Sequence, residues 1–363
     1  MKHNQNRKKL LKIGFLMDPM EKILLDVDTS ISIMMEAQKR GHQIFYIEPE
    51  DLVYENGTLG AEARQVLTSR TTGFKTVSRK RMDLKMLDVI FNRKEPPFDA
   101  SYLYLTQLLE LIEPRVFIVN SPRGVRKANE KLYILEFPKW IPPTFVSNEP
   151  ERIETFFKKE KSDLIVKPLD ERGGKGIHLI RRGSRNAREI LNEMTQCGAK
   201  WVMAQKFLNQ GLTEGDKRIL LLNGEVIGVF GKIPKKGEFR ANLSLGAKHV
   251  RATLTKKECQ LIEELRPKLI RDGLYFAGID VIDGKLLEIN VTSPAGIPEI
   301  NELEKTHLEV QVVDFLEQSS LRGSRRRTKQ SRDPRQTAWI ATSTYGLLAM
   351  TAVLEPIFNA VFE

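Results

Sequence analysis

The stretch Leu286-Leu287-Glu288-Ile289-Asn290-Val291-Thr292-Ser293-Pro294 sets a carboxylate and a carboxamide two residues apart at the end of an apolar run. Side chains at positions i and i+2 of a β-strand point to the same face, so Glu288 and Asn290 would present oxygen atoms side by side. Oxygen ligands of this kind suit Mg²⁺. The stretch therefore predicts a strand that carries a candidate metal site.

A second apolar run, 276–282, precedes this strand and contains Asp280. Asp283-Gly284 between the two runs is typical of a hairpin turn, which would make the strands antiparallel and bring a third oxygen ligand close. Mg²⁺ usually binds few carboxylates and completes its coordination with water and nucleotide phosphates. The cluster therefore favours a nucleotide site, although solvated carboxylates at a hairpin end remain an alternative.

A glycine-rich segment, Lys167-Pro168-Leu169-Asp170-Glu171-Arg172-Gly173-Gly174-Lys175-Gly176, follows the apolar strand 164–166. Its glycines would let backbone N–H groups approach a phosphate closely, although an ordinary hairpin would look similar. The segment matches neither the P-loop nor the dinucleotide fingerprint. Lys131 and Arg218 add cations suited to phosphate groups.

Apolar runs at 12–17, 44–47, 88–91 and 116–119 predict strands of a parallel sheet. A helix capped by Asp28 or Thr29 and ending before Gly41, and another at 103–112, would lie between them. Prolines at 138, 142 and 143 mark the passage to a second region, where 202–205 is expected to be a strand. The expected parts are a basic arm (1–11), an N-terminal substrate domain (12–122), a nucleotide-binding domain (123–318), a basic flexible linker (319–336) and an apolar C-terminal segment (337–363).

Composition narrows the class of protein. The two cysteines, Cys197 and Cys259, provide neither a disulfide framework nor a metal quartet, which favours a reducing cytoplasm. The net charge of +11 is concentrated at the ends, with +5 in residues 1–12, +6 in residues 322–335 and only +2 in residues 13–321. The body lacks a basic face interleaved with aromatic residues, so we expect no nucleic-acid partner. The N-terminus lacks the apolar region of a signal peptide.

Taken in order, the motifs resemble the bacterial-type glutathione synthetases of the ATP-grasp superfamily. The resemblance covers residues 12 to 318 and rests on Met17-Asp18-Pro19, Asp28-Thr29-Ser30, Glu36-Ala37-Gln38-Lys39-Arg40-Gly41, Arg93-Lys94-Glu95-Pro96-Pro97-Phe98-Asp99, Val119-Asn120-Ser121-Pro122, Asn129-Glu130-Lys131, Lys167-Pro168-Leu169-Asp170, Gly173-Gly174, Met203-Ala204-Gln205, Gly215-Asp216-Lys217-Arg218, Arg240-Ala241-Asn242-Leu243 and the opening stretch. It implies an α/β ATP-grasp fold with an N-terminal Rossmann-like (pre-ATP-grasp) parallel-sheet domain.

The resemblance also implies a reaction, the ATP-dependent ligation of γ-L-glutamyl-L-cysteine with glycine through an acyl phosphate, which releases ADP and phosphate. The cofactors would be ATP and two Mg²⁺ ions, with Mn²⁺ as a substitute, and the enzyme would be a cytoplasmic homotetramer. The residues implied for ATP are Lys131, Lys167, Arg172, Gly173, Gly174, Lys175, Gly176, Gln205, Phe207, Leu208 and Asp216. Those implied for metal are Asp280, Glu288 and Asn290; for catalysis Arg218, Arg240 and Lys232; and for substrates Asp28, Thr29, Ser30, Asn242 and Ser293.

Three positions depart from the family pattern. Lys232 stands in Gly231-Lys232-Ile233-Pro234 where the family usually has arginine, Ala247 replaces the second glycine of a pair, and Pro298 replaces a common arginine. Because lysine lacks the bidentate fork of arginine, these departures leave open another ATP-grasp ligase with a different amine acceptor. A nucleotide-binding regulatory protein without turnover is less compatible with the complete metal trio.

The C-terminal tail lies outside the resemblance. A basic stretch, 322–335, precedes the nearly uncharged segment 338–354, which is shorter than the roughly 20 apolar residues that a membrane-spanning helix needs. A cytoplasmic-face membrane or partner anchor and a docked or frayed helix are therefore both compatible with it.

Overall fold

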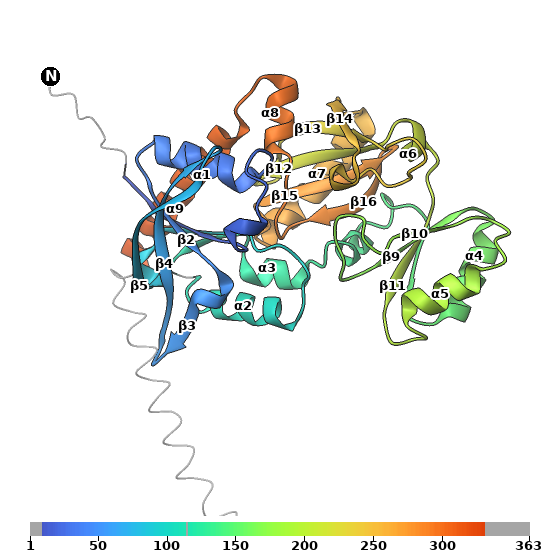
Figure 1. Cartoon of the computed structure of the whole chain (residues 1–363), viewed down its shortest axis with the longest axis horizontal. Helices are drawn as coiled ribbons and strands as arrows, with labels where there is room; N and C mark the ends of the chain where they lie inside the picture. Colours follow the sequence, from blue (N-terminus) through green and yellow to red (C-terminus); the bar gives the residue numbers. More distant parts are fainter. Residues whose placement is uncertain (1–8, 114, 331–363) are drawn as a thin grey trace, which may run out of the picture. The chain divides into compact units, whose positions relative to one another are not determined.

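The computed structural model describes residues 9–113 and 115–330, and their strands form three sheets. The first sheet uses strands between residues 12 and 119, and the second and third follow it in the chain (Figure 1). This is a mixed α/β architecture, as the sequence predicted.

Parallel strands in the order β2-β1-β6-β7 form one part of the first sheet, with β7 at its edge. Both faces of these strands are buried, which explains why they read as continuous apolar runs. The strands are β1 Lys12–Leu16, β2 Gln43–Ile47, β6 Val89–Asn92 and β7 Phe117–Val119; the helices that follow β1, β6 and β7 are α1 Thr29–Lys39, α2 Ala100–Glu110 and α3 Pro122–Lys127.

The start of α1 is set by Asp28, whose carboxylate accepts hydrogen bonds from the backbone N–H groups of Ser30 (2.6 Å) and Ile31 (3.0 Å). Of the two capping residues that we considered, Asp28 is therefore the N-cap. Gly41, with φ of 85°, follows the C-cap residue Arg40 as expected.

The first sheet has an antiparallel extension that was not expected from the sequence. It consists of β3 Leu52–Glu55, β4 Thr58–Ser69 and β5 Gly73–Asp83, and β4 joins the parallel strands by pairing with β2. The signal for its first turn was present: Asn56 and Gly57 both have positive φ (48° and 83°), as a two-residue hairpin turn requires.

The second sheet is antiparallel, in the order β10-β9-β11-β8, and helices α4 and α5 pack against it. Leu164, Val166 and Ala204 from the strands meet Ile153 and Leu191 from the helices in its core. The bounds are β8 Thr144–Ser147, α4 Pro150–Glu160, β9 Leu164–Pro168, β10 His178–Ile180, α5 Ala187–Thr195 and β11 Val202–Lys206.

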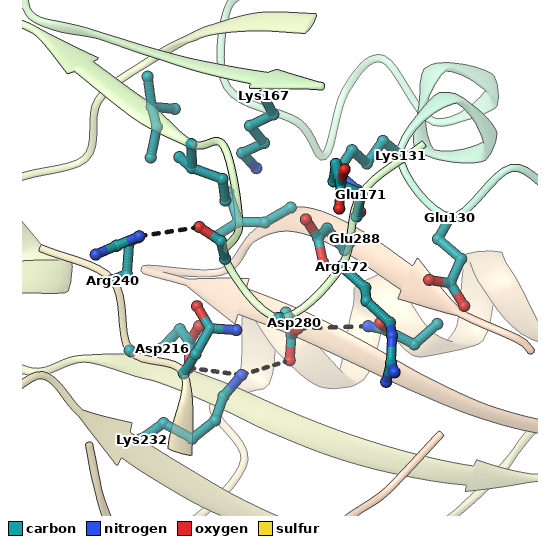
Figure 2. A pocket seen from close by; sticks show the side chains of 18 of the residues that line it. Glu130, Lys131, Lys167, Glu171, Arg172, Asp216, Lys232, Arg240, Asp280 and Glu288 are labelled. Atoms are coloured by element: carbon teal, nitrogen blue, oxygen red, sulfur yellow. Dashed lines mark hydrogen bonds and ion pairs between the residues drawn. The ribbon is translucent and has the colours of Figure 1, made fainter. Parts of the chain in front are cut away.

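The third sheet is also antiparallel, in the order β14-β13-β12-β15-β16, and two of its strands form the predicted hairpin. Asp283 and Gly284 make the turn between β15 and β16 with φ of 48° and 64°. Side chains of both strands, among them Asp280 and Glu288, border the cavity drawn in Figure 2. The bounds are α6 Gln210–Thr213, β12 Asp216–Leu222, β13 Glu225–Ile233, β14 Lys248–Arg251, α7 Lys256–Arg271, β15 Phe276–Ile282, β16 Lys285–Asn290 and α8 Ile297–Glu304.

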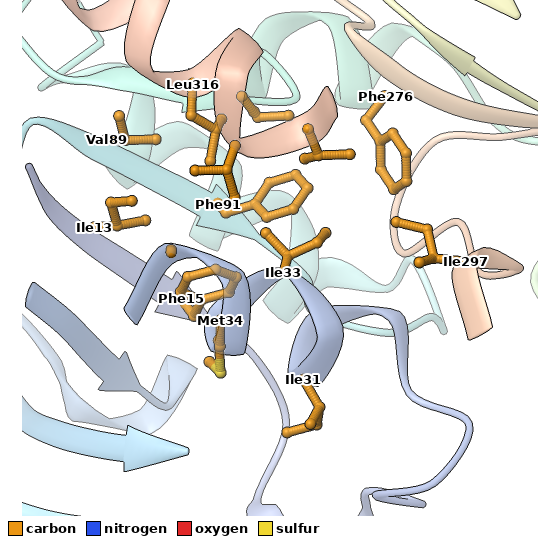
Figure 3. Packing of buried hydrophobic residues seen from close by; sticks show 14 of the residues in the cluster. Ile13, Phe15, Ile31, Ile33, Met34, Val89, Phe91, Phe276, Ile297 and Leu316 are labelled. Atoms are coloured by element: carbon orange, nitrogen blue, oxygen red, sulfur yellow. The ribbon is translucent and has the colours of Figure 1, made fainter. Parts of the chain in front are cut away.

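The largest hydrophobic core joins the first sheet to the third. Phe15 and Phe91 from the parallel strands lie in one cluster with Phe276 of β15 and Ile297 of α8 (Figure 3). Residues up to Leu316 accordingly form one compact unit.

Helix α9 runs from Leu308 to Gln330. Residues 319–330 belong to the expected flexible linker, but they continue this helix. Arginine, lysine and glutamine are good helix formers, so a basic composition is compatible with this helix. The remainder of the expected linker and the apolar segment 337–363 lie outside the described residues. Among the described residues, none of the helices has the length and apolar character needed to cross a membrane.

Candidate active site

A cavity of about 330 Å³ is lined by residues of the second and third sheets and by the loops beside them (Figure 2). It collects most of the predicted site residues. Those that line it are Lys131, Lys167, Arg172, Gly173, Gly174, Lys175, Gln205, Phe207, Leu208, Asp216, Arg218, Lys232, Arg240, Asn242, Asp280, Glu288, Asn290 and Ser293.

Strand register explains why the third sheet concentrates charge here. Arg218 of β12 is paired with Asp280 of β15, which is paired in turn with Glu288 of β16. Asp216, two residues before Arg218, is paired with Lys232 of β13. Because directly opposed residues point to the same face of a sheet, these side chains form one charged row facing the cavity.

Asp280 is the centre of an ion-pair network. Its Oδ1 and Oδ2 accept hydrogen bonds from Nε (2.7 Å) and Nη2 (2.8 Å) of Arg218, and Nζ of Lys232 lies 3.1 Å from Oδ1. Lys232 also lies 3.1 Å from Oδ1 of Asp216. Burial by itself would raise the pKa of Asp280, but Arg218 and Lys232 outweigh burial and hold that pKa below its usual value.

Asp216 behaves in the opposite way. Burial raises the pKa of its carboxyl from 3.8 to about 6, and the attraction of Lys232 only partly offsets this effect. Lys232 itself is almost fully buried, with 5% of its surface exposed. The single ammonium group of Lys232 is therefore shared by two buried carboxylates, a task that needs no bidentate fork.

The oxygen atoms expected to bind metal face the same cavity. Asn290 donates from Nδ2 to the carbonyl oxygen of Gly278 (3.2 Å) and weakly to Asp280 (3.4 Å), which leaves its Oδ1 available. The described residues contain no cluster of three or more Asp, Glu, His or Cys side chains arranged to hold a metal. The donors here are instead two carboxylates and one carboxamide, a hard-oxygen set that fits Mg²⁺ if other ligands complete its coordination.

Two lysines approach the cavity from the second sheet and the segment before it. Lys167 lies on β9 and is 4% exposed, and burial lowers the pKa of its amine. Lys131 precedes the short 3₁₀ helix η4 (Leu132–Glu136) and donates to the carbonyl oxygen of Glu171 at 2.6 Å. The cavity therefore brings two amines close to the glycine-rich segment, an arrangement suited to phosphate groups.

Gln205 on β11 is fully buried, and its Oε1 has no hydrogen-bond partner among the described residues. Its Nε2 donates to Oγ1 of Thr144 at 3.0 Å, which fixes the orientation of the amide. An unpaired buried acceptor is unfavourable unless a ligand supplies a donor. Its position beside Phe207 and Leu208 fits a planar base that carries an amino group.

The glycine-rich loop contacts a second loop over the cavity. Gly174 has φ of 76°, a conformation that favours glycine, and a Cβ there would clash with the side chain of Asn242. Nη1 of Arg240 donates to the carbonyl oxygen of Gly174 at 3.2 Å. Glu238 holds this guanidinium, and the resulting hydrogen bonds lower the pKa of Glu238 to about 2.

A second cavity of about 440 Å³ adjoins the first, with which it shares Glu95, Pro96, Arg172 and Ser293. Of the predicted substrate-binding residues, Asp28 and Ser30 line this second cavity. Thr29 lines neither cavity: its side chain is buried, and Oγ1 accepts hydrogen bonds from the N–H groups of Gly296 and Ile297. Gly176 likewise lies outside both linings.

The other departures from the family pattern lie in local backbone features. Pro298 occupies the first turn of α8, where a missing N–H costs no intrahelical hydrogen bond. Ala247 follows Gly246, which takes φ of 87° at the end of the short 3₁₀ helix η5 (Leu243–Leu245). The only glycine that this turn requires is therefore retained.

Three charged residues near the cavities were not among the predicted site residues. Arg93 is buried and donates to Oγ of Ser30 (2.9 Å) and to the carbonyl oxygen of Pro294 (2.8 Å). Glu130 accepts from the end of β16, and Glu95 pairs with Arg172. Glu95 and Arg93 follow a buried strand of a parallel sheet, a position that could have indicated them.

The fold defines the class of protein, one with the ATP-grasp fold. Solved structures with this fold include the D-cycloserine synthetase DcsG (TM-score 0.62, 15% identity, 86% of this chain and 100% of that one). They also include the ATP-grasp ligase PsnB complexed with a minimal precursor, Mg and ADP (TM-score 0.54, 15% identity, 85% and 98%).

The chain belongs to the prokaryotic glutathione synthetase family. The models of the family's N-terminal domain and ATP-grasp domain match residues 11–126 and 130–305. Glutathione synthetases of Synechocystis sp. (40% identity, 85% of this chain and 99% of that one) and Shewanella oneidensis (39%, 85% and 98%) are similar over most of their length. The protein is thus an ATP-dependent carbon–nitrogen ligase of glutathione biosynthesis.

Proposed function

We propose that this protein joins γ-glutamylcysteine to glycine with ATP, through an acyl phosphate formed at the meeting point of the two cavities. The observation that carries the proposal is the row Arg218, Asp280 and Glu288, which faces Lys167 and the glycine-rich loop in a chain of this family. A carboxylate is a poor electrophile, so phosphorylation is what makes it reactive toward an amine. Neighbouring cations offset the charge that develops.

The nucleotide would occupy the first cavity. Lys131, Lys167 and the 172–176 loop would contact its phosphates, and Oε1 of Gln205 would accept from the adenine amino group. Phe207 and Leu208 would enclose the base, and Asp216 would lie near the ribose. This orientation places the phosphates beside the charged row of the third sheet.

Two Mg²⁺ ions would be held by Asp280, Glu288 and Asn290, and Mn²⁺ could replace them. Bound there, the metal supplies positive charge that polarises the transferring phosphoryl group. Asp280 already has Arg218 and Lys232 as partners, so these cations would have to share it with the metal or move to the phosphoryl group.

Arg218, Lys232 and Arg240 would stabilise the acyl phosphate and the tetrahedral oxyanion. The second cavity would hold the dipeptide, with Asp28 and Ser30 on its wall and Ser293 at the junction. Asn242 would contact substrate from the loop over the first cavity. For Thr29, we propose a supporting role, because its hydroxyl orders the start of α8.

Glycine remains the proposed acceptor despite the three departures. Lys232 has two carboxylate partners, and Pro298 fits the start of a helix, so neither substitution points to a different amine. The relatives named glutathione synthetase at about 40% identity favour the same conclusion over the alternative ligase.

The localisation, oligomeric state and partners of the protein are also proposals. We expect a cytoplasmic homotetramer that acts on small molecules and binds no nucleic acid. Any contact with the cytoplasmic face of a membrane would depend on the C-terminal tail, residues 319–363, of which 331–363 lie outside the described part of the chain.

A screen of amines against carboxylate substrates tests the proposed function. We expect ADP release and a product of the mass of glutathione only when γ-glutamylcysteine and glycine are both present. ADP release that requires γ-glutamylcysteine with an amine other than glycine would assign the protein to the rival ligase instead.

A further inference from the structure

Glu95 stands where the two cavities meet. It follows β6, and its backbone is anchored on both sides: its N–H donates to Oδ2 of Asp18 (2.8 Å), and its carbonyl oxygen accepts from Nζ of Lys94 (3.0 Å). Its carboxylate pairs with Arg172 of the glycine-rich loop, yet 35% of the side chain remains accessible. Of the four residues in the described part of the chain that border both cavities, Glu95 is the only acid.

The ligation needs a proton acceptor at this junction. Near neutral pH the acceptor enters as an ammonium ion, which has no lone pair with which to attack the acyl carbon. A carboxylate that touches the ammonium can remove one proton as the nitrogen approaches. The peptide carboxyl must reach from the second cavity toward the phosphates in the first, so the attack takes place at their shared wall.

The other acids around the first cavity have different partners or roles. Oε1 of Glu130 accepts three hydrogen bonds, Asp216 and Asp280 are paired with Lys232, and Glu288 belongs to the proposed metal site. Glu171 lies in the glycine-rich loop, with its carboxylate 3.7 Å from Lys175. Glu95 is therefore the acid best placed to meet an amine arriving beside the peptide carboxyl.

We propose that the carboxylate of Glu95 is the general base that takes a proton from the acceptor ammonium in this ligation, an inference that rests on the proposed function. The ammonium gives one proton to Glu95, and its nitrogen bonds to the acyl carbon. The bond from that carbon to the phosphate oxygen then breaks, and the phosphate leaves with the second proton as hydrogen phosphate. The remaining nitrogen-bound proton stays on the amide, and Glu95 ends protonated.

The surroundings of Glu95 support this role. Burial raises the pKa of its carboxyl, and the nearby Asp28 acts in the same direction. Arg172, Arg93 and a hydrogen bond with Ser293 act in the opposite direction without cancelling the rise. Asp18 and Lys94 pair with each other beside its backbone. A carboxyl with a raised pKa holds an abstracted proton better than an ordinary one does.

The test uses Glu95→Gln with two acceptors. Glycine must lose a proton before it attacks, whereas hydroxylamine is already neutral at pH 7. We expect kcat with glycine to fall by about 100-fold or more, the usual contribution of a general base, while hydroxylamine still traps γ-glutamylcysteine as its hydroxamate at a rate near that of the unaltered enzyme. Positional exchange of an oxygen isotope between the bridging and non-bridging atoms of ATP should also persist in Glu95→Gln. This assay contains γ-glutamylcysteine but no acceptor, so it measures acyl phosphate formation alone.

Arg172→Gln is the matched comparison, because it breaks the same ion pair but keeps the carboxylate. It should leave the ratio of glycine to hydroxylamine rates nearly unchanged, and Glu95→Asp should recover part of the glycine activity. Equal losses with both acceptors in Glu95→Gln, or the same selective loss in Arg172→Gln, would overturn the inference and leave Glu95 a structural tether. Failure of the unaltered enzyme to make glutathione would instead refute the proposed function.

Discussion

Asp280 and Glu288 are opposed across β15 and β16, but their partners differ. Both oxygen atoms of Asp280 contact cations of the protein, whereas the carboxylate of Glu288 has no hydrogen-bond partner among the described residues. If both bind metal, Glu288 offers its charge without first breaking an ion pair. Loss of that charge should therefore affect the metal directly.

We predict that Glu288→Gln lowers kcat/KM by about 100-fold and raises the Mg²⁺ concentration needed for half-maximal activity. Loss of a residue that merely supports a metal ligand typically lowers metal affinity or activity by about 10–100-fold, and a ligand should matter at least as much. Mg²⁺ titrations of ADP release and of nucleotide binding measure both effects. The same change at Glu193, exposed on α5, is the control and should have no effect. Near-normal ADP release by Glu288→Gln at limiting Mg²⁺ would refute the metal assignment.

At the scale of the elements, Glu130 holds the end of strand β16 through several hydrogen bonds. The backbone carbonyl of Glu130 accepts from the N–H of Ile289 (2.9 Å), and its Oε1 accepts from the N–H groups of Val291 (3.0 Å) and Thr292 (3.1 Å) and from the Thr292 hydroxyl (2.8 Å). One residue thereby ties the strand that carries Glu288 and Asn290 to the segment that carries Lys131.

We predict that Glu130→Ala lowers the free energy of unfolding by about 2–3 kcal/mol, because buried N–H donors lose a charged acceptor. Glu130→Gln keeps an acceptor oxygen and should lose about half as much. Urea unfolding measures the stability, and the Mg²⁺ and ATP dependence of turnover measures the effect on the site. Equal stability of the alanine and glutamine variants would show that the hydrogen bonds contribute little.

The C-terminal end of α7 joins a second network. Asp272 accepts hydrogen bonds from the hydroxyl of Tyr133 (2.7 Å), from Nζ of Lys268 (2.9 Å) and from Nζ of Lys127 (3.1 Å). Burial would raise the pKa of Asp272, but these partners outweigh burial and lower it from 3.8 to about 2.

A depressed carboxyl pKa stabilises the folded state above the unfolded pKa, and this stability is lost as the pH falls through the folded pKa. Asp272→Asn should therefore reduce the free energy of unfolding at pH 7 by about 2 kcal/mol. The difference from the unaltered protein should shrink as the pH falls from 3.8 toward about 2. Urea unfolding at a series of pH values measures it, and a difference that grows on acidification would contradict the assignment.

On the scale of the whole molecule, one hydrophobic core contains residues from both sides of the domain boundary expected at residue 122. Phe91, from the N-terminal part, is close to Phe276, with ring centroids 5.8 Å apart, and Ile297 and Leu316 lie in the same cluster (Figure 3). Asn120 also bonds through its side chain to the backbone of Phe276 and Val291. We therefore expect the first and third sheets to unfold together.

The tail gives a prediction about the complete chain. Each Lys or Arg near an anionic membrane contributes about 1 kcal/mol, and a weak apolar segment beside a basic stretch can form a firm anchor. We expect the full chain to bind vesicles that contain anionic lipid and to be released by high salt. A chain ending at Gln318 should bind less, stay soluble and keep its ligase activity, because every predicted site residue lies upstream. Sedimentation with vesicles compares the two chains, and equal behaviour would rule out an anchor in residues 319–363.

The parts that the sequence alone determined are local. Glu288 and Asn290 share a strand face because side chains alternate along a strand, and Asp283-Gly284 turns the chain because both residues accept positive φ. The apolar runs predict the parallel strands. Strands β3 and β5 lack such runs because they are largely exposed, and β4 lacks one because charged and polar residues interrupt its buried positions. The types of oxygen and nitrogen atom expected at the site also follow from the sequence.

Only the tertiary structure decided which of these groups meet. Strand pairing sets Arg218 opposite Asp280, although 62 positions separate them, and loop packing brings Glu95 to Arg172 across 77 positions. It also placed Thr29 under the start of α8 and away from both cavities. Register and loop contacts depend on the packing of distant segments, and local patterns carry no information about that packing.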